Sequence, residues 1–423
     1  MIWATLLLVP TIIIQSKIEY AIVLSIIICF FEENHWIPLR SFFSQHQKAI
    51  LLYFIVTTSI LIFSEEVPLQ LQMVTFRHDL LILLLIIETF LLCRDYTFVK
   101  SLLKLVCICL FLNAIYCLFF EIIEGFNPAG SPLYLLLGVD NSEYFVDMID
   151  QERGIFDYRL QSIFGHPLSL GQYFLVLVPI LYYLENKVLS IICIICVSIL
   201  ILLTGTRGAF IPLLIMLVFG AGSFINKNYK IPIATGVIVF SLFFVNYLEN
   251  NNTGNKSVSV IISSFKFWDD SLQRRNNIHG SDMELRIVQF LGALKEIEEN
   301  PLFGKGLKYR EYYQNNHGGR HPVLLGYESV ALLYLVERGW VGLLFFFITL
   351  YYMYLVFKQN ATDTSIIKLV FIACIISYVM TGVRPLTLAF LGLTCSVICG
   401  LNNVNIINNN NNFGNETRTK YYL

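Results

Sequence analysis

Long apolar runs separated by short polar segments make up most of the chain. A helix needs about 20 apolar residues to cross a bilayer, and fewer where it is irregular. The pattern predicts an all-α polytopic membrane protein with about 12 transmembrane helices. The first run has no basic n-region and no small-residue cleavage site, so we expect a retained helix there. The predicted spans are 2–15, 18–32, 48–64, 79–93, 101–121, 168–184, 187–204, 208–225, 231–247, 339–357, 365–381 and 385–401.

Two long polar insertions, 122–167 and 248–338, interrupt the apolar pattern. Short-loop basic residues are expected on the cytoplasmic side. The outer short turns hold only Lys17, Arg77, Arg207 and Arg384 when both termini are placed in the cytoplasm. Both insertions then face outward. The predicted organisation is N-terminal transmembrane helices (1–121), a first extracytoplasmic loop (122–167), central helices (168–247), a large loop (248–338), C-terminal helices (339–401) and a disordered Asn-rich tail (402–423).

Composition supports the membrane interpretation and removes other classes. Charged residues make up 14% of the chain and hydrophobic residues 56%, whereas soluble domains carry about 25% charged residues. The net charge is −1, with no long basic patch, so no nucleic-acid partner is expected. All ten cysteines lie in apolar runs, which implies no disulfide framework. The outer insertions contain no HExxH or DxD spacing, so no metal is expected.

Ionisable residues gather at the predicted outer ends of the spans. Arg207 lies in the turn "LTGTRGAF", where neighbouring glycines suit an oxyanion or phosphate site made of N–H groups and a guanidinium. An arginine at a helix end also reaches lipid headgroups, and this is the simpler interpretation of Arg384. The candidates are Arg159, His166, Arg207, Arg286, His321, Glu328 and Arg384.

The stretch "MELRIVQFLGALKEIEENPLFGKGL" predicts an amphipathic helix followed by a glycine-rich turn. The apolar residues Leu285, Val288, Leu291 and Leu294 recur at helical spacing. Pro301 ends the helix. Arg286 is either part of a site or paired with Glu284 or Asp282 on a solvated face, and His166 and His321 have the ordinary alternative of loop histidines.

The stretch "GYESVALLYLVERGWVGLLFF" (326–346) carries ionisable groups beside a predicted span. We expect residues 328–338 to form a short interfacial helix before the span that starts at 339. Glu337 and Arg338 are then expected at headgroup depth, where charges are tolerated. Glu328 either caps this helix or has a chemical role.

Four segments together resemble the O-antigen ligase and polymerase superfamily, over roughly residues 155–400. They are "SIFGHPLSLGQYF", "LTGTRGAFIPLL", "LRIVQFLGALKEIEENPLFGKGL" and "ESVALLYLVERGWVGLLFF". The resemblance implies a GT-C-like helical enzyme of the bacterial cytoplasmic (inner) membrane. Its active site is expected to face the periplasm or the cell exterior.

The resemblance also implies a reaction and its residues. The enzyme would transfer glycan from undecaprenyl pyrophosphate to an acceptor sugar hydroxyl, without a metal or cofactor. Arg207 and Arg286 match the two arginine positions of the family, and they are expected to bind the pyrophosphate together with Arg384. Glu328 stands on the family's histidine position and Ser329 on the adjacent polar position, so Glu328 is expected to act as the base, with His321 as the alternative. Arg159 and His166 are further candidates.

Three functions remain open. A polymerase would join lipid-linked repeat units, a ligase would transfer finished glycan to a lipid A core, and a flippase would move the lipid-linked oligosaccharide without chemistry. The departure from histidine at Glu328 favours the polymerase, and charges at one face favour catalysis over transport. The expected partners are the lipid-linked donor, the acceptor glycan, membrane lipid, a chain-length regulator and a flippase.

The base role generates the first prediction. Glu328→Gln should stop transfer, by about 10²–10⁴-fold, because an amide does not accept the hydroxyl proton. Donor binding should stay largely intact. A transfer assay paired with a donor-binding measurement checks this, and an active variant would assign the base role to another group.

Overall fold

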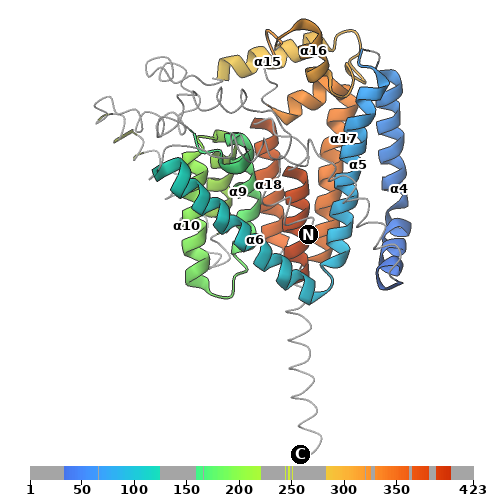
Figure 1. The fold of residues 1–423 in the computed structure, drawn as a ribbon. Helices are drawn as coiled ribbons and strands as arrows, with labels where there is room; N and C mark the ends of the chain where they lie inside the picture. Colours follow the sequence, from blue (N-terminus) through green and yellow to red (C-terminus); the bar gives the residue numbers. More distant parts are fainter. Residues whose placement is uncertain are drawn as a thin grey trace, which may run out of the picture.

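The computed structural model describes residues 33–64, 66–123, 159–164, 166–220, 243, 246–247, 250, 283–319, 321–324, 329–361, 364–380 and 387–401. The predicted spans 2–15 and 18–32, most of span 231–247 and the tail lie outside these residues. The regular elements of the described part are helices arranged as a bundle, which confirms the all-α class (Figure 1).

Nine of the predicted spans coincide with helices in the described residues. Ile37–Phe63, Tyr96–Ile123 and Val330–Asn360 are long and apolar enough to cross a membrane, and five shorter apolar helices accompany them. The total of about 12 spans stays a prediction. The helices are α4 (Glu33–Phe63), α5 (Leu69–Leu92), α6 (Tyr96–Tyr116) with the π-helix η1 (Cys117–Ile123), α9 (Pro167–Leu181), α10 (Lys187–Leu203), α11 (Arg207–Gly220), α15 (Met283–Glu296), α16 (Tyr309–His317), α17 (Val330–Asn360), α18 (Thr364–Met380) and Thr387–Leu401.

Two helices, α4 and α5, begin much earlier than predicted. α4 starts at Glu33 where a span from 48 was expected, and α5 starts at Leu69 where a span from 79 was expected. Hydropathy detects the apolar part of a helix, whereas backbone hydrogen bonds continue wherever neighbouring protein packs against the helix. The extra turns of α5 contain the buried residue Gln72 and carry Asp79 inside the helix.

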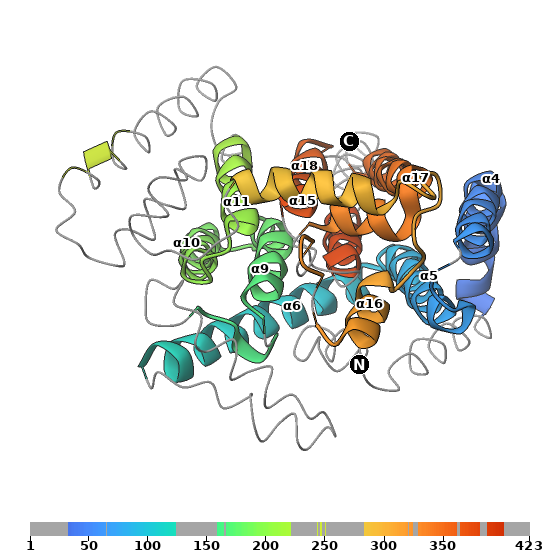
Figure 2. The same ribbon diagram turned by 90° about the horizontal axis from the view of Figure 1, so that it is seen from above.

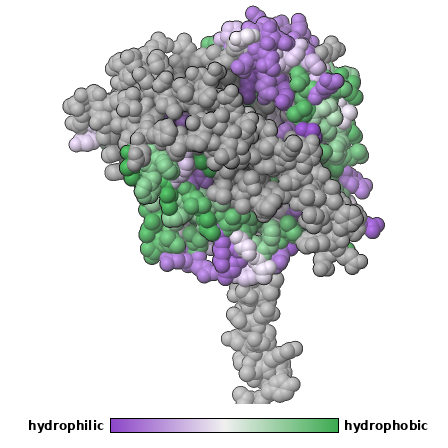
Figure 3. Space-filling model, viewed as in Figure 1, coloured by the Kyte–Doolittle hydropathy of each residue, from purple (hydrophilic) through white to green (hydrophobic). Residues whose placement is uncertain are grey.

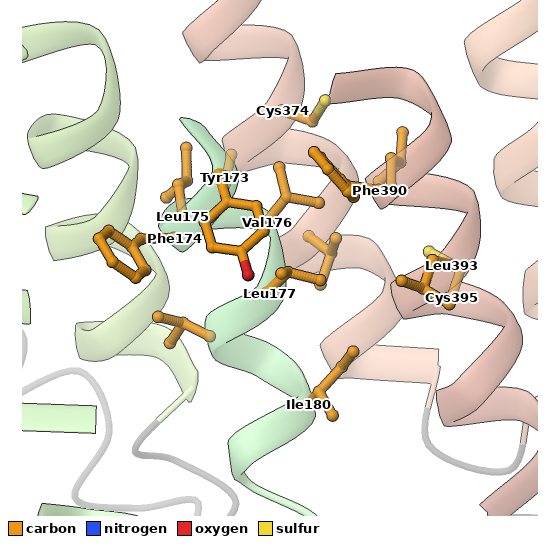
Figure 4. Close-up of a cluster of buried hydrophobic side chains, with 14 of the residues drawn as sticks. Tyr173, Phe174, Leu175, Val176, Leu177, Ile180, Cys374, Phe390, Leu393 and Cys395 are labelled. Atoms are coloured by element: carbon orange, nitrogen blue, oxygen red, sulfur yellow. The ribbon is translucent and has the colours of Figure 1, made fainter. Parts of the chain in front are cut away.

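α9 forms the centre of the bundle and is buried along almost its whole length. Its side chains pack between α10 and α11 on one side and α18 and Thr387–Leu401 on the other (Figure 4). The Gln172 side chain donates to Ser377 Oγ at 2.9 Å and accepts from Thr387 Oγ1 at 2.8 Å. This satisfied polar contact fixes the register of three helices within an apolar core.

The outer surface is apolar between two polar ends. Ile191, Ile192 and Ile195 on α10 are about half exposed. Figure 3 shows an apolar band on this face, with hydrophilic residues over α15 and α16 above it and at the opposite end below it. A surface of this kind suits lipid, because exposed apolar patches of this extent are unusual on soluble monomers. The chain is an integral membrane protein.

α17 is broken at Gly339, and the glycine-rich turn fills the break. Gly339 has φ +61° and ψ −167°, which separates 330–338 from the following helix. The two ends of the break expose carbonyls and N–H groups that no helix turn satisfies. Lys305 N donates to Val336 O at 2.9 Å and Gly306 N to Glu337 O at 3.0 Å. In return, the N–H groups of Trp340 and Val341 donate to the carbonyls of Pro301 and Leu302, at 2.9 and 3.1 Å.

This backbone pairing leaves no room for side chains at its centre. A Cβ on Gly339 would lie 2.3 Å from Leu302 O. A Cβ on Gly304, which also has positive φ, would lie 2.5 Å from Gly339 N. Both glycines are therefore required by close approach as well as by backbone conformation.

The same turn also fastens the end of α4. Asn300 Nδ2 donates to Phe63 O at 2.7 Å, which satisfies one of the last carbonyls of α4. The Phe63 and Phe303 rings stack with centroids 4.9 Å apart. The glycine-rich turn thus joins α4 to α17.

Lys305 adds a charged contact to this junction. Its ammonium group lies 3.3 Å from Glu66 and 3.2 Å from Glu299. Burial by itself lowers the pKa of Lys305, but the hydrogen bond to Glu299 and the charge of Glu66 outweigh it, so this pKa is raised. The lysine therefore stays charged at neutral pH.

Glu337 and Arg338 are buried in protein, and their position at headgroup depth stays a prediction. Arg338 pairs with Asp79 of α5 and lies over the Tyr334 ring, 4.2 Å from its centroid. A Cβ on Gly342 would lie 2.0 Å from Arg338 Cβ, so the absence of a side chain at Gly342 leaves space for the arginine side chain. The buried charge of Arg338 is compensated by its ion pair with Asp79, which joins α17 to α5.

The pairing at Gly339 generates the second prediction. Gly339→Ala should destabilise the protein by at least about 2 kcal/mol, since positive φ and a backbone clash act together. Thermal unfolding in detergent measures the loss. Gly319→Ala is the control, because a Cβ there meets nothing within 4 Å. Equal melting temperatures for the two variants would contradict this account.

Candidate functional site

The predicted outer residues that the structure describes lie at one end of the bundle, which we call the α15 end. α15 and α16 cross this end, and α17 begins there (Figure 1). Seen from above, the N-terminal end of α15 overlies α11 (Figure 2), whose first residue is Arg207. Arg286 is half-buried in the first turns of α15. The two arginines predicted to bind pyrophosphate therefore lie on α11 and α15 at the same end of the bundle.

The turn before Arg207 is held by a buried arginine. Arg159 Nε donates to Thr204 O at 2.7 Å, and its Nη2 donates to Thr206 Oγ1 at 3.2 Å. Only 6% of Arg159 is exposed. The fork of the guanidinium thus ties the end of α10 to the start of α11, and Arg207 follows at once. Arg159 positions the turn.

His166 and the start of α9 complete this corner. His166 is the N-cap of α9, and its Nδ1 accepts from Leu168 N at 3.1 Å. Thr206 Oγ1 donates to Pro167 O at 3.2 Å. A Cβ on Gly171 would lie 3.1 Å from Thr206 Cβ, so α9 and the turn are in close contact. The hydrogen bond from Leu168 N to the His166 ring is that of a helix cap.

A carboxylate that sequence reasoning did not single out anchors the segment carrying Arg159. Glu121 is fully buried in the π-helix η1, and it accepts from the N–H groups of Gln161 and Ser162 at 3.0 Å. Ser162 has φ +49°, and its Oγ donates to Asn113 Oδ1 at 3.0 Å. π-Helical turns are common near functional sites. The available signal was an acid at the end of an apolar run, "CLFFEII".

His321 is held at both ring nitrogens. Its Nδ1 accepts from Val323 N at 3.2 Å and Leu324 N at 3.0 Å. The proton of the neutral ring is therefore assigned to Nε2, which donates to Glu296 Oε2 at 3.2 Å. The Tyr309 hydroxyl donates to the other Glu296 oxygen. This geometry favours an orienting role for His321, because a base needs a nitrogen lone pair directed at substrate.

A cavity of about 560 Å³ adjoins this group, a size in the range of ligand pockets, roughly 300–1,000 Å³. Lysine and glutamate side chains line this cavity together. The lining residues are Gly292, Lys295, Glu296, Glu298, Glu299, Lys305, His321 and Val323. Within the described ranges, no group of three or more His, Cys, Asp or Glu is arranged to hold a metal. Metal independence stays a prediction.

Ser329 caps α17 and links it to α18. Its Oγ accepts from Leu332 N at 3.4 Å and donates to Tyr378 O at 3.3 Å. Only 3% of Ser329 is exposed. The preceding residue, Glu328, lies outside the described residues, as does Arg384, so the predicted base and the third predicted arginine have no described geometry.

Part of the chain matches a known protein family. Residues 192–347 match the family described as O-antigen ligase. This range includes Arg207, Arg286, His321, Glu328 and Ser329. The resemblance to the O-antigen ligase and polymerase superfamily is thereby confirmed over these residues, and it supports a membrane enzyme of polysaccharide biosynthesis. No curated protein matches the chain.

The clamped turn generates the third prediction. Arg159→Lys should lower transfer at least about tenfold while the protein stays in the membrane, because an ammonium does not reproduce the fork to Thr204 and Thr206. Transfer assays normalised to protein amount measure this. Arg40→Lys on an exposed part of α4 is the control and should be silent. Full activity of Arg159→Lys would show that the turn does not need the fork.

Proposed function

We propose that the protein is a surface polysaccharide polymerase. It transfers a growing glycan from undecaprenyl pyrophosphate to a sugar hydroxyl of another lipid-linked repeat unit. The reaction takes place on the outer side of the bacterial cytoplasmic membrane, at the α15 end of the bundle. The product is an O-antigen, a capsule or an exopolysaccharide.

One observation carries this proposal. Arg207 directly follows a turn that the buried Arg159 side chain holds through two hydrogen bonds. Arg286 lies on α15, which crosses the same end of the bundle. Both arginines fall in the segment matched to the O-antigen ligase family. Guanidinium groups suit a pyrophosphate, because they bind phosphate oxygens through paired hydrogen bonds.

The chemistry follows from charge. The acceptor hydroxyl oxygen bonds to the anomeric carbon of the donor sugar while the bond from that carbon to the pyrophosphate oxygen breaks. The electron pair leaves with the lipid pyrophosphate, whose new charge Arg207 and Arg286 stabilise. The hydroxyl proton passes to a base, for which Glu328 is the candidate. The activated donor already carries the free energy for transfer, so no nucleotide or metal is assigned.

A ligase is the second candidate, favoured by the description of the matched family. The polymerase is preferred because Glu328 stands where the ligases carry histidine. The acceptor decides between them. A polymerase lengthens glycan on undecaprenyl pyrophosphate, whereas a ligase moves it to a lipid A core or another surface acceptor. A chain-length regulator and a flippase are the protein partners this pathway step implies.

The arginine roles generate the fourth prediction. Arg207→Ala and Arg286→Ala should each abolish long glycan chains with normal protein in the membrane, because the leaving group loses its counter-charge. Single lipid-linked repeat units should accumulate on the outer side, and the wild-type reaction should proceed in EDTA. Gel analysis of glycan and side-specific labelling of lipid-linked units measure this.

Arg40→Ala is the control, since Arg40 is exposed on α4. Normal chain length in both site variants would exclude the pyrophosphate role. Accumulation of repeat units on the inner side would indicate a flippase.

A further inference from the structure

α15 turns one polar residue, Gln289, inward and leaves several apolar residues exposed. Ile287, Val288 and Leu291 are 54%, 46% and 59% exposed. Gln289 is fully buried, as are Ala293 further along the helix and Ile297 just after its end. The predicted helix is confirmed. Its buried face differs from the predicted one, because Val288 and Leu291 were expected on the apolar face and are exposed.

Packing at the C-terminal half of α15 sets this rotation. Ala293 and Ile297 join a cluster with Leu333 and Val336 of α17. Gly292 admits Val323, whose Cγ1 would lie 2.5 Å from a Cβ at that position. These contacts fix the helix about its own axis, and the same rotation brings Gln289 to the inner side.

The buried amide of Gln289 has no hydrogen-bond partner among the described residues. Within the described ranges, neither its nitrogen nor its oxygen has a partner, although the side chain is 0% exposed. An unpaired buried polar group costs about 1–3 kcal/mol. Native proteins satisfy nearly all such groups, so an exception with both a donor and an acceptor unpaired calls for a physical reason.

The position of Gln289 supplies that reason. It follows Arg286 by three residues, which places both on one face of the helix, about 4.5 Å apart along the axis. The N-terminal end of α15, with Arg286 in its first turns, overlies α11, which begins at Arg207 (Figure 2). In a lipid-linked donor, the group next to the pyrophosphate is a sugar. An amide supplies one acceptor and two N–H groups, the pattern that sugar hydroxyls and acetamido groups pair with.

We propose that Gln289 binds the sugar attached to the donor pyrophosphate, through hydrogen bonds to a hydroxyl or acetamido group. This inference rests on the proposed function, because Arg286 locates the pyrophosphate. Gln289 then acts in donor recognition. A buried amide that pairs with one substituent rejects a sugar lacking it, because the amide stays unpaired in that complex.

Gln289→Met tests the proposal, because methionine has nearly the same length and carries no hydrogen-bonding groups. The melting temperature should hold or rise by a few degrees, since an unpaired buried amide is removed. The KM for the lipid-linked donor should rise at least tenfold, with a smaller change in kcat. Val288→Met, on the exposed flank of the same turn, is the matched control and should change neither quantity.

A donor analogue provides an independent readout. The native enzyme should use a donor whose first sugar is deoxygenated at the recognised position at least tenfold less well than the natural donor. Gln289→Met should lose that discrimination. A purely structural glutamine would leave the preference between the two donors unchanged in the variant, and this result would overturn the proposal.

The outcomes separate the two levels of inference. Inactive Arg207→Ala and Arg286→Ala variants together with a native donor KM in Gln289→Met would reject only the role of Gln289. Long glycan chains in both arginine variants would reject the proposed function itself.

Discussion

The backbone pairing between the 300–307 turn and the break at Gly339 is the constraint on which the α15 end depends. Four reciprocal N–H to carbonyl bonds replace the helix hydrogen bonds lost at the break. Unpaired backbone groups are costly in a low-dielectric environment, so the break persists only with its partner segment in place. The turn directly follows α15, so this pairing holds the helix with Arg286 and Gln289 over the bundle.

A second set of buried polar contacts organises the other half of this end. Glu121 holds the backbone at Gln161 and Ser162, and Arg159 from the same segment holds the turn before Arg207. The Glu121 carboxylate and the Arg159 guanidinium both have hydrogen-bond partners, and such pairing allows a polar network to be buried inside an apolar bundle. Two sets of contacts, from different parts of the chain, thus position the two elements that carry the arginines of the proposed donor site.

Sequence patterns predicted the helices better than their faces. Hydropathy located the spans matched by α9, α10 and α18 to within a few residues. Glycine spacing in "NPLFGKGL" indicated a tight turn without showing that it pairs with the break at Gly339. Asp79 and Glu121 were passed over because each borders an apolar run, where an acid has several ordinary explanations. Their partners, Arg338 and the 161–162 backbone, lie far away in the sequence.

The sequence by itself indicated the class through apolar runs of membrane length, charges near the ends of these runs, and four segments that resemble one enzyme family. These features are local, so a single chain records them. Only the tertiary structure decided that Arg159 positions its neighbours, that both nitrogens of His321 are engaged, and that Gln289 and not Val288 or Leu291 faces inward. The physical reason is that the rotation of a helix and the partner of a buried charge depend on packing between segments far apart in the chain.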